Sequence, residues 1–381
     1  MRIAFIGCGY VADFYMKTLP NHPGLELVSV VDRDASRSAQ FAAFHRVRRV
    51  PSVRDVLGDP RVELVVNLTN PSSHYEISKA ALEAGKHVYS EKPLAMSVEH
   101  AEELVLLSRS RGLLLSAAPC SVLGESAQTL WKALRKGVIG TVRAVYAEID
   151  DGPVHLMNYR KWASDSGAPW PYKDEFEVGC TLEHAGYYVT WLAAFFGPAR
   201  TVTSYATCLV PDKGAEVSRI TADFTVACIE FASGVVARLT CSIYGPHDHS
   251  LRIIGDGGIL SIHDCWDYGA PVHISKRTRL GIKAEKYPRA ALLAGMGPKR
   301  LPLVRKPRFS FRSRGANVMD FARGIADMAQ AIDAKGTARI SPEFSLHINE
   351  IVLAIQNPAE LGNPRRIKTT FEPMQPMPWA E

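Results

Sequence analysis

The residue of this sequence that is best placed to take part in a reaction is a lysine that follows a predicted strand. The predicted strand from Lys86 to Ser90 is followed by Glu91, Lys92 and Pro93. In a doubly wound sheet, ligands bind just beyond the carboxyl ends of the strands. An ammonium at that edge can donate a hydrogen bond to a substrate hydroxyl or carbonyl oxygen. The alternative is a surface lysine that only caps the strand, and the position favours a function.

A second set of titratable groups lies on one predicted helix. Helical spacing places His184, Tyr188 and Trp191 on one face. Glu183 and Tyr187 fall on an adjoining face. A histidine and a phenol one turn apart can pass a proton on, whereas a buried helix whose polar groups only satisfy local hydrogen bonds is the alternative. Together with the lysine, Tyr188 and His184 are the candidate catalytic residues.

The N-terminal segment carries a dinucleotide-binding pattern. An apolar strand runs into the glycine-containing turn at residues 7–12, a helix-like segment follows, and a second apolar strand ends on Asp32. Gly7 permits a tight turn, Gly9 lets the backbone approach a pyrophosphate, and Ala12 lets the helix pack on the strand. The carboxylate at the end of the second strand can accept hydrogen bonds from a ribose hydroxyl. This order of elements predicts a bound dinucleotide.

Composition is typical of a globular protein with room for two domains. The chain has 381 residues, of which 46% are hydrophobic and 22% charged. Its apolar stretches, such as residues 187–196, are much shorter than the ~20 residues that cross a bilayer. The N-terminus is itself a predicted core strand with no room for a signal peptide. We therefore expect a cytoplasmic protein without a transmembrane segment.

Seven cysteines are scattered along the chain, and none belongs to a CxxC pair. An odd number without metal-ligand spacing favours free buried thiols over disulfides or a zinc site. We therefore expect no metal site.

Positive charge is concentrated in one segment. Between Lys276 and Arg314 the chain has thirteen Lys or Arg and one acid, Glu285, together with an apolar island at 290–296. A solvated loop explains such a run, and so do a site for a phosphorylated substrate, contact with an anionic membrane surface, or subunit contacts. Nucleic acid is disfavoured, since no aromatic interleaving or known nucleic-acid module accompanies the charge.

The order of predicted elements indicates two architectures. In the first 120 residues, apolar strand runs such as Val62 to Leu68 alternate with helical patterns. This alternation predicts a Rossmann-type, doubly wound parallel sheet. After Gly140, longer strands of alternating polarity predict an α+β unit with a large, mostly antiparallel sheet that leaves one face open. We expect domains at 1–120 and 121–381, the second with a basic insertion at about 276–314.

Further motifs are distributed over nearly the whole chain: Thr69 to His74, Ala84 to Ala95 around Glu-Lys-Pro, Gly137 to Gly140, Leu346 to Glu350 and Thr369 to Pro373. With the glycine turn, they resemble the glucose–fructose oxidoreductase / inositol dehydrogenase / rhizopine-catabolism (Gfo/Idh/MocA) family. The resemblance implies a Rossmann domain, a C-terminal domain with an open sheet, and hydride exchange between a nicotinamide cofactor and a sugar or cyclitol carbon. It also implies a cis proline in the Glu-Lys-Pro motif and a homodimer or homotetramer formed through the open sheet.

The resemblance and the glycine turn together predict the cofactor site. Asp32 favours NAD(H), because a carboxylate repels the 2′-phosphate of NADP(H). Arg33 can turn toward such a phosphate, so NADP(H) stays open. The cofactor-binding residues that we expect are Gly7, Gly9, Tyr10, Val11, Ala12, Asp32, Arg33, Thr69, Asn70, Pro71, His74, Glu91, Lys92 and Pro93.

The resemblance also suggests how the catalytic residues act. Many relatives carry an aspartate and a histidine four residues apart on the helix that here holds His184 and Tyr188, so the acid is missing at these positions. Some sugar oxidoreductases of the family use a tyrosine beside the lysine as proton donor. That chemistry suits Tyr188 with Lys92 and leaves His184 as a relay or orienting group.

These observations predict an NAD(H)-dependent oxidoreductase of carbohydrate metabolism, acting on a CH–OH group of a sugar, cyclitol or sugar nucleotide. Two alternatives come from the same family. An NAD-dependent glycosidase would oxidise a sugar carbon, eliminate the aglycone and reduce the product again. A non-catalytic sensor would bind dinucleotide and a partner protein. Lys92 with a titratable partner favours an enzyme over a sensor.

Overall fold

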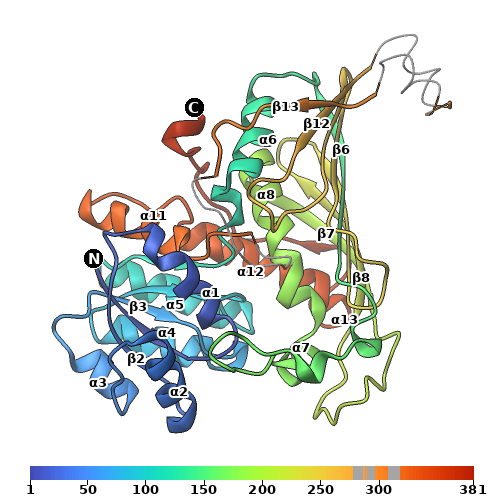
Figure 1. Ribbon diagram of the computed structural model, residues 1–381. Coiled ribbons are helices and arrows are strands. Elements are labelled where there is room, and N and C mark those ends of the chain that lie inside the picture. The colour runs from blue at the N-terminus through green and yellow to red at the C-terminus, as the bar shows by residue number, and fades with distance from the viewer. Residues whose placement is uncertain (278–285, 288, 290–296, 308–317) are drawn as a thin grey trace.

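Two sheets with their helices form the structure of this protein, a computed structural model (Figure 1). The structure describes all residues except 278–285, 288, 290–296 and 308–317. A parallel five-stranded sheet comes first, and a mostly antiparallel nine-stranded sheet follows. The predicted fold class, a Rossmann sheet followed by an α+β unit with a large open sheet, is confirmed.

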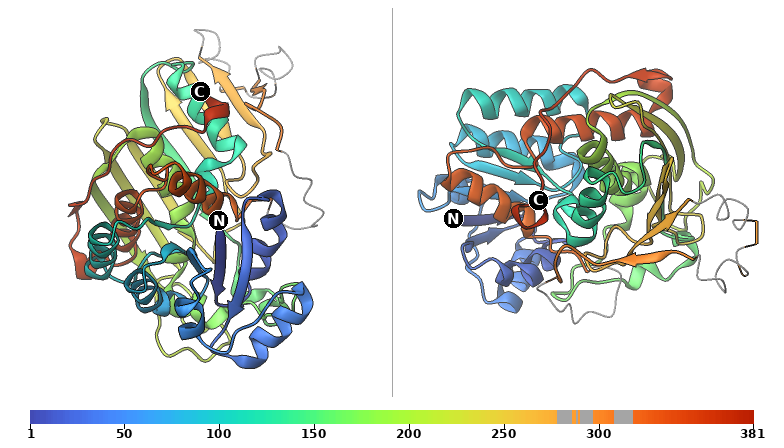
Figure 2. Two further views of the ribbon diagram at one scale, coloured as in Figure 1. Left: turned by 90° about the vertical axis from the view of Figure 1, so that its left-hand side faces the viewer. Right: turned by 90° about the horizontal axis from the view of Figure 1, so that it is seen from above.

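The first sheet is formed by the buried apolar runs of the sequence. Its strands are β1 (Arg2–Ile6), β2 (Glu26–Val31), β3 (Leu64–Asn67), β4 (His87–Ser90) and β5 (Leu115–Ala117). They pair in parallel in the order β2-β1-β3-β4-β5. The connecting helices, which cover both faces (Figure 2), are α1 (Ala12–Thr18), α2 (Ala35–His45), α3 (Val53–Gly58), α4 (His74–Glu83) and α5 (Val98–Ser110).

The strand order places the predicted cofactor residues along one edge. The order reverses between β1 and β3, and ligands bind at such a switch point beyond the carboxyl ends of the strands. Gly7 follows β1, Asp32 follows β2 and Glu91 follows β4. Sequence segments up to 84 residues apart therefore meet at one crevice.

The second sheet alternates in polarity as its sequence predicts. Its strands are β6 (Val142–Asp150), β7 (Ala199–Thr207), β8 (Phe224–Phe231), β9 (Val236–Ser242), β10 (Leu251–Gly255), β11 (Gly258–Ile262), β12 (Val272–Lys276), β13 (Lys299–Leu301) and β14 (Arg365–Arg366). Their order is β13-β12-β11-β10-β6-β9-β8-β7-β14, and the pair β6–β9 is parallel.

Helices pack on one face of this sheet, and among the described residues no helix covers the other face (Figures 1 and 2). The helices of this half are α6 (Glu125–Arg135), α7 (Tyr172–Val178), the π-helical turn η6 (Thr181–Ala185), α8 (Gly186–Phe196), α11 (Arg323–Asp333), α12 (Pro342–Gln356) and α13 (Pro358–Leu361). The core between α6, α8, α12 and the sheet is apolar and continuous.

Helix α11 packs with the first sheet although it comes late in the sequence. Its residues Ile325 and Met328 are fully buried in the same core as β1 and α1. The N-terminal core therefore includes residues beyond the predicted boundary at residue 120.

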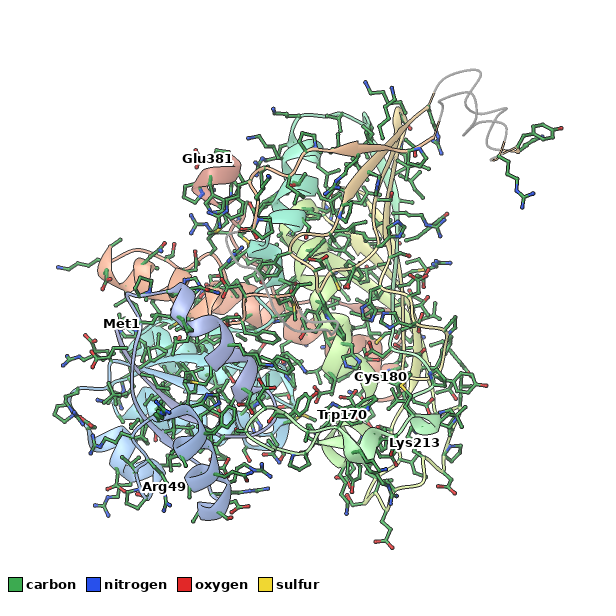
Figure 3. All side chains as sticks on the ribbon, viewed as in Figure 1. Met1, Arg49, Trp170, Cys180, Lys213 and Glu381 are labelled. Atoms are coloured by element: carbon green, nitrogen blue, oxygen red, sulfur yellow. The ribbon has the colours of Figure 1, made fainter. Side chains whose placement is uncertain are left out.

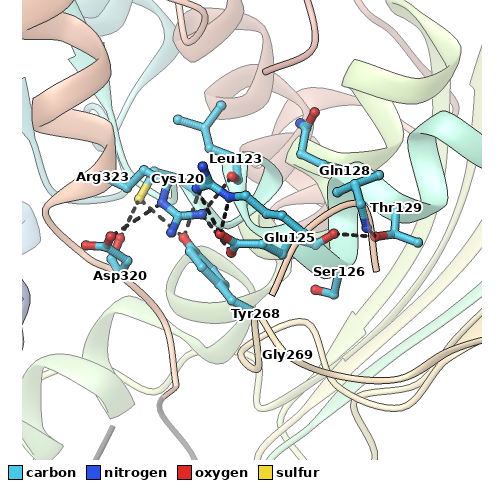
Figure 4. Close-up of polar contacts among 12 residues, drawn as sticks. Cys120, Leu123, Glu125, Ser126, Gln128, Thr129, Tyr268, Gly269, Asp320 and Arg323 are labelled. Atoms are coloured by element: carbon cyan, nitrogen blue, oxygen red, sulfur yellow. Dashed lines mark hydrogen bonds and ion pairs between the residues drawn. The ribbon is translucent and has the colours of Figure 1, made fainter. Parts of the chain in front are cut away.

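A buried ionic cluster fixes the start of α11 (Figure 4). Arg323 Nη1 lies 2.9 Å from Glu125 Oε2 of α6, and Arg323 Nε lies 3.4 Å from Asp320 Oδ2. The guanidinium also lies over the ring of Tyr268, 4.8 Å from its centroid. Glu125 and Asp320 are fully buried, so their charges depend on these partners. The cluster thereby connects the core of the first sheet to α6 of the second unit.

Part of the basic segment has structural partners. Arg305 forms an ion pair with Glu125 at 2.9 Å and lies over the ring of Trp379, 3.6 Å from its centroid. Lys299 and Arg300 belong to the edge strand β13. The apolar island at 290–296 lies outside the described residues. Within the described part of the chain, no helix has the length and apolar character required to cross a membrane.

The buried cluster generates a stability prediction. Glu125→Gln should lower the free energy of unfolding by about 3 kcal/mol, because it leaves the charge of Arg323 buried without its main carboxylate. Urea denaturation followed by circular dichroism measures this change. Asp256→Asn is the matched control, since it breaks the solvent-exposed pair with Arg143 and should leave the midpoint unchanged. Equal midpoints for both variants would contradict the proposed role of the cluster.

Candidate active site

The glycine turn after β1 has the shape that a dinucleotide needs. Gly7 has a φ of +104°, and a Cβ at this position would lie 2.4 Å from the carbonyl oxygen of Leu68. Only glycine satisfies both constraints. A Cβ at Gly9 would meet no atom within 4 Å, so open space lies above this part of the turn. The turn can therefore accept a phosphate close to its backbone.

Asp32 is held at the end of β2 by backbone groups. Its two carboxylate oxygens accept hydrogen bonds from the backbone N–H of Cys8 at 2.8 Å and of Asp34 at 2.9 Å. Arg33 and Arg37 line the same cavity, whose volume is about 460 Å³. Arg37 Nη1 is buried without a hydrogen-bond partner. Arg37 lies in the first turn of α2, four residues after Arg33, and was not among the predicted cofactor residues.

His74 connects the loop after β3 to the Glu-Lys-Pro motif. The ring nitrogens of buried His74 lie 2.7 Å from the carbonyl oxygen of Pro93 and 3.0 Å from that of Thr69. Burial lowers the pKa of His74, whereas the contacts with these two carbonyl oxygens oppose the shift. Asn70 and Pro71, which follow Thr69, line the adjoining cavity. His74 thus acts as a brace between two cofactor-facing segments.

Glu91 fixes the backbone beside the lysine. Its carboxylate accepts a 2.6 Å hydrogen bond from the Tyr15 hydroxyl and a 3.1 Å hydrogen bond from the backbone N–H of Lys92. The Lys92–Pro93 peptide bond is cis, as the family resemblance implies. The motif therefore has a defined backbone path before its side chains act.

A second cavity of about 270 Å³ continues from the cofactor cavity toward the second sheet. Gly9, Tyr10, Asn70 and Asp174 line both cavities, so the two form one cleft. Trp170 lies on the wall of this cleft at the junction of the two units (Figure 3). A dinucleotide that follows the glycine turn would extend from the outer cavity into the inner one.

Lys92 and Glu183 form an ion pair inside the inner cavity. Their side chains are 20% and 11% exposed, so solvent screens the pair weakly. Burial disfavours the charge of Lys92, but the carboxylates of Glu183, Glu91 and Glu175 outweigh burial and raise the pKa of Lys92 above its usual value. The lysine is therefore an ammonium at neutral pH.

The structure places Tyr187, and not Tyr188, beside Lys92. Tyr187 lines the inner cavity, and its ring packs edge-on against Trp266. Tyr188 is fully buried, and its hydroxyl donates a hydrogen bond to the carbonyl of His249. The predicted pairing of Tyr188 with Lys92 is therefore not formed.

Helical spacing accounts for the difference. Glu183, His184 and Tyr187 are three and four residues apart, and all three line the inner cavity. Tyr188 is one residue further round the helix and belongs to the apolar core between the helices and the second sheet. Glu183, four residues before Tyr187, places a carboxylate in the cavity.

His184 lies between two carboxylates at the edge of the inner cavity. Its Nδ1 lies 2.9 Å from Asp151 Oδ2, and its Nε2 lies 3.6 Å from Glu175 Oε1. Burial opposes the charge of His184, but these two carboxylates prevail and raise its pKa to about 10. Burial raises the pKa of Glu175 to about 7, with His184 opposing the shift. Asp151 and Glu175 were not predicted, because neither belongs to a recognisable motif.

Comparisons with known proteins agree with this arrangement. Residues 1–118 match a family described as an oxidoreductase family with an NAD-binding Rossmann fold. Residues 127–261 match the GFO/IDH/MocA C-terminal domain. Together the two matches span most of the chain.

Individual relatives are dehydrogenases and reductases. The trans-1,2-dihydrobenzene-1,2-diol dehydrogenase of Mus musculus is 26% identical over 273 residues, which cover 70% of this chain and 75% of that enzyme. The UDP-N-acetylglucosamine 3-dehydrogenase of Acidithiobacillus ferrooxidans has a similar fold, with a TM-score of 0.69, 21% identity and coverage of 93% and 96% of the two chains. A 3-ketoreductase from Actinomadura kijaniata, solved with NADP, matches with a TM-score of 0.70 and 22% identity. The match covers 94% of this chain and 97% of that enzyme.

The environment of Asp32 generates a prediction about cofactor choice. The native protein should bind NADH more tightly than NADPH, because the carboxylate accepts ribose hydroxyls and repels a 2′-phosphate. Asp32→Ser should reduce the ratio of the NADPH and NADH dissociation constants roughly tenfold, because one hydrogen bond to a charged group contributes about that factor. Titration of protein fluorescence with each cofactor measures both dissociation constants.

Asp34→Ser is the control for this experiment. It removes a nearby exposed acid and retains a side chain that can cap α2, so the ratio of the two dissociation constants should stay native. Tighter binding of NADPH by the native protein would show that Arg33 and Arg37 outweigh Asp32.

Proposed function

This chain belongs to the Gfo/Idh/MocA oxidoreductase family, and on that premise we propose that it transfers hydride between a nicotinamide dinucleotide and a sugar or sugar-nucleotide carbon. The observation that carries the proposal is the position of Lys92. Its ammonium lies at the inner end of the dinucleotide cleft, paired with Glu183 and in the same cavity as Tyr187. A proton donor and a cation thus meet where the reacting end of the cofactor would lie.

The residues of the cleft fit a dinucleotide. The turn at Gly7 and Gly9 would hold the phosphates, and Asp32 would accept the ribose hydroxyls. Thr69, Asn70 and His74 border the passage to the inner cavity. The nicotinamide, when bound, supplies or accepts the hydride.

Lys92 can bind and polarise the substrate oxygen. Its ammonium has three N–H donors, and Glu183 accepts one of them. The remaining donors can contact the carbonyl oxygen of a ketone or the hydroxyl of an alcohol. Positive charge at this point stabilises the negative charge that develops on the oxygen during reduction.

Tyr187 can hold the proton that the reaction moves. Burial raises the pKa of Tyr187 and the charge of Lys92 opposes this shift, so the phenol keeps its proton at neutral pH. In the reduction of a ketone, the phenol gives this proton to the substrate oxygen. In the oxidation of an alcohol, the same steps run in reverse.

A sugar or sugar-nucleotide substrate is supported by the relatives. A UDP-N-acetylglucosamine 3-dehydrogenase and a 3-ketoreductase share this fold, and a 1,5-anhydro-D-fructose reductase from Ensifer adhaerens is 32% identical over 170 residues, 44% of this chain and 50% of that enzyme. The substrate is to be found by a screen of free sugars, cyclitols and sugar nucleotides. The readout is a change in nicotinamide absorbance. Release of an aglycone without a net absorbance change would favour a glycosidase, and bound cofactor without turnover would favour a sensor.

The two neighbouring tyrosines provide a matched test of the catalytic site. Lys92→Met and Tyr187→Phe should each lower kcat roughly 10²-fold or more, because each removes a positioned group from proton transfer. Tyr188→Phe should keep most of the activity, since its hydroxyl is fully buried and bonds to the carbonyl of His249. Affinity for NADH should stay near native in all three. The opposite ranking of the two tyrosines would overturn the assignment.

Glu183 generates a separate prediction about pH. Glu183 has the largest of the charges that oppose burial, so its loss lowers the pKa of Lys92, and Glu183→Gln should move the alkaline limb of the kcat profile to lower pH. Glu183→Asp retains the charge and should keep the limb near its native position. An alkaline limb unmoved by Glu183→Gln would show that Glu183 does not control the charge of Lys92.

A further inference from the structure

A cluster of imidazole and carboxylate groups lies where β6 ends, behind the inner cavity. A short antiparallel bridge joins Asp150 to Asp248, with two backbone hydrogen bonds of 2.9 Å. Side chains alternate between the two faces of a strand, so Asp151, His247 and His249 project to the same side. One potential ligand atom from each of these three residues lies within 4.8 Å of the others.

Two imidazoles and one carboxylate form a ligand set that suits a divalent transition-metal ion. Zn²⁺ binds histidine nitrogen and carboxylate oxygen at about 2.0–2.2 Å, which places neighbouring ligand atoms a little over 3 Å apart. His249 Nε2 and Asp151 Oδ1 are already 2.8 Å apart. His247 is exposed, so it can rotate to complete the set and gives an ion access from solvent.

Two further side chains contact the residues of this cluster. His249 Nδ1 lies 3.6 Å from Asp264 Oδ1, and Asp151 Oδ2 lies 2.9 Å from His184 Nδ1. Metal-binding histidines usually donate their second nitrogen to a carboxylate, which orients the ring. The side chain of His249 is 1% exposed, yet its Nδ1 has no hydrogen-bond partner. An ion bound at Nε2 would leave Nδ1–H free to turn toward Asp264, the arrangement that metal-binding histidines usually have.

We propose that Asp151, His247 and His249 bind one divalent transition-metal ion, with Zn²⁺ as the tested example. The site is separate from the cofactor cleft but touches it through His184, which contacts Asp151 and lines the inner cavity. The expectation of no metal site rested on cysteine spacing. The sequence signal for this site is the pair of histidines on either side of Asp248.

Metal binding to the full chain tests the proposal without a substrate. Protein treated with a chelator and dialysed is titrated with Zn²⁺ by calorimetry and with Co²⁺ by visible absorption. We expect one equivalent per chain and a Co²⁺ spectrum without thiolate charge-transfer bands. His247→Ala should weaken Zn²⁺ binding at least tenfold, because it removes a ligand. Asp264→Asn should weaken it roughly tenfold, because His249 loses the carboxylate that orients its ring. Because His247 is exposed, its replacement leaves the core intact.

His273→Ala is the matched control. His273 lies beside His263 on the other part of the sheet, with ring centroids 6.0 Å apart, and this pair belongs to no three-residue ligand group among the described residues. Its replacement should not change the affinity. The proposal is overturned if the native protein takes up no stoichiometric Zn²⁺, if His247→Ala binds as tightly as the native protein, or if the Co²⁺ spectrum shows cysteine ligation.

Discussion

The arrangement of the cleft depends on one buried ion pair between two parts of the chain. Lys92 comes from the edge of the first sheet, and Glu183 comes from the helix that lies on the second sheet. Both side chains are largely buried, so removal of one would leave the other charge weakly solvated. The pair therefore connects the two parts of the chain at the inner cavity. Lys92 and Tyr187 share that cavity in this arrangement.

A second buried ion pair connects the two parts of the chain at another place. Arg323 and Glu125 connect the core of the first sheet to α6, and both are shielded from solvent. Buried pairs contribute little net stability compared with apolar packing, but one partner without the other is costly. Two such contacts at separate places restrict how the sheets can shift relative to each other. A fixed cleft is a requirement for hydride transfer, which needs close and well-oriented reactants.

The sequence predicted those parts of the fold that depend on local pattern. The run from Ile3 to Asp32 fixes strand, turn, helix and strand by apolar spacing and by two glycines, and the structure agrees. The short edge strands β13 and β14 were not predicted, because two or three residues carry no periodicity. Tyr187 and Tyr188 are neighbours on one helix, and spacing alone does not show which of them faces the cavity and which faces the core of the second sheet.

Residues that meet only in three dimensions were beyond sequence reasoning. Asp151 lies behind His184 because β6 ends there and the bridge to Asp248 holds the segment in place. Glu175 reaches the same cavity from α7. Neither position has a motif of its own. The structure shows their effect, since both carboxylates raise the pKa of His184. Burial in turn raises the pKa of Glu175.

The charges around the inner cavity restrict what it can accept. Four carboxylates, those of Glu91, Asp174, Glu175 and Glu183, line it, against the cations of Lys92 and His184. A phosphate placed beside Lys92 would face this acidic wall at short range in a weakly screened site, and the repulsion would oppose binding. A neutral hydroxyl or carbonyl meets no such penalty. Under the proposed function, a substrate with an uncharged reacting part fits this cavity, and the diphosphate of a nucleotide-linked sugar would lie away from Lys92, outside the inner cavity.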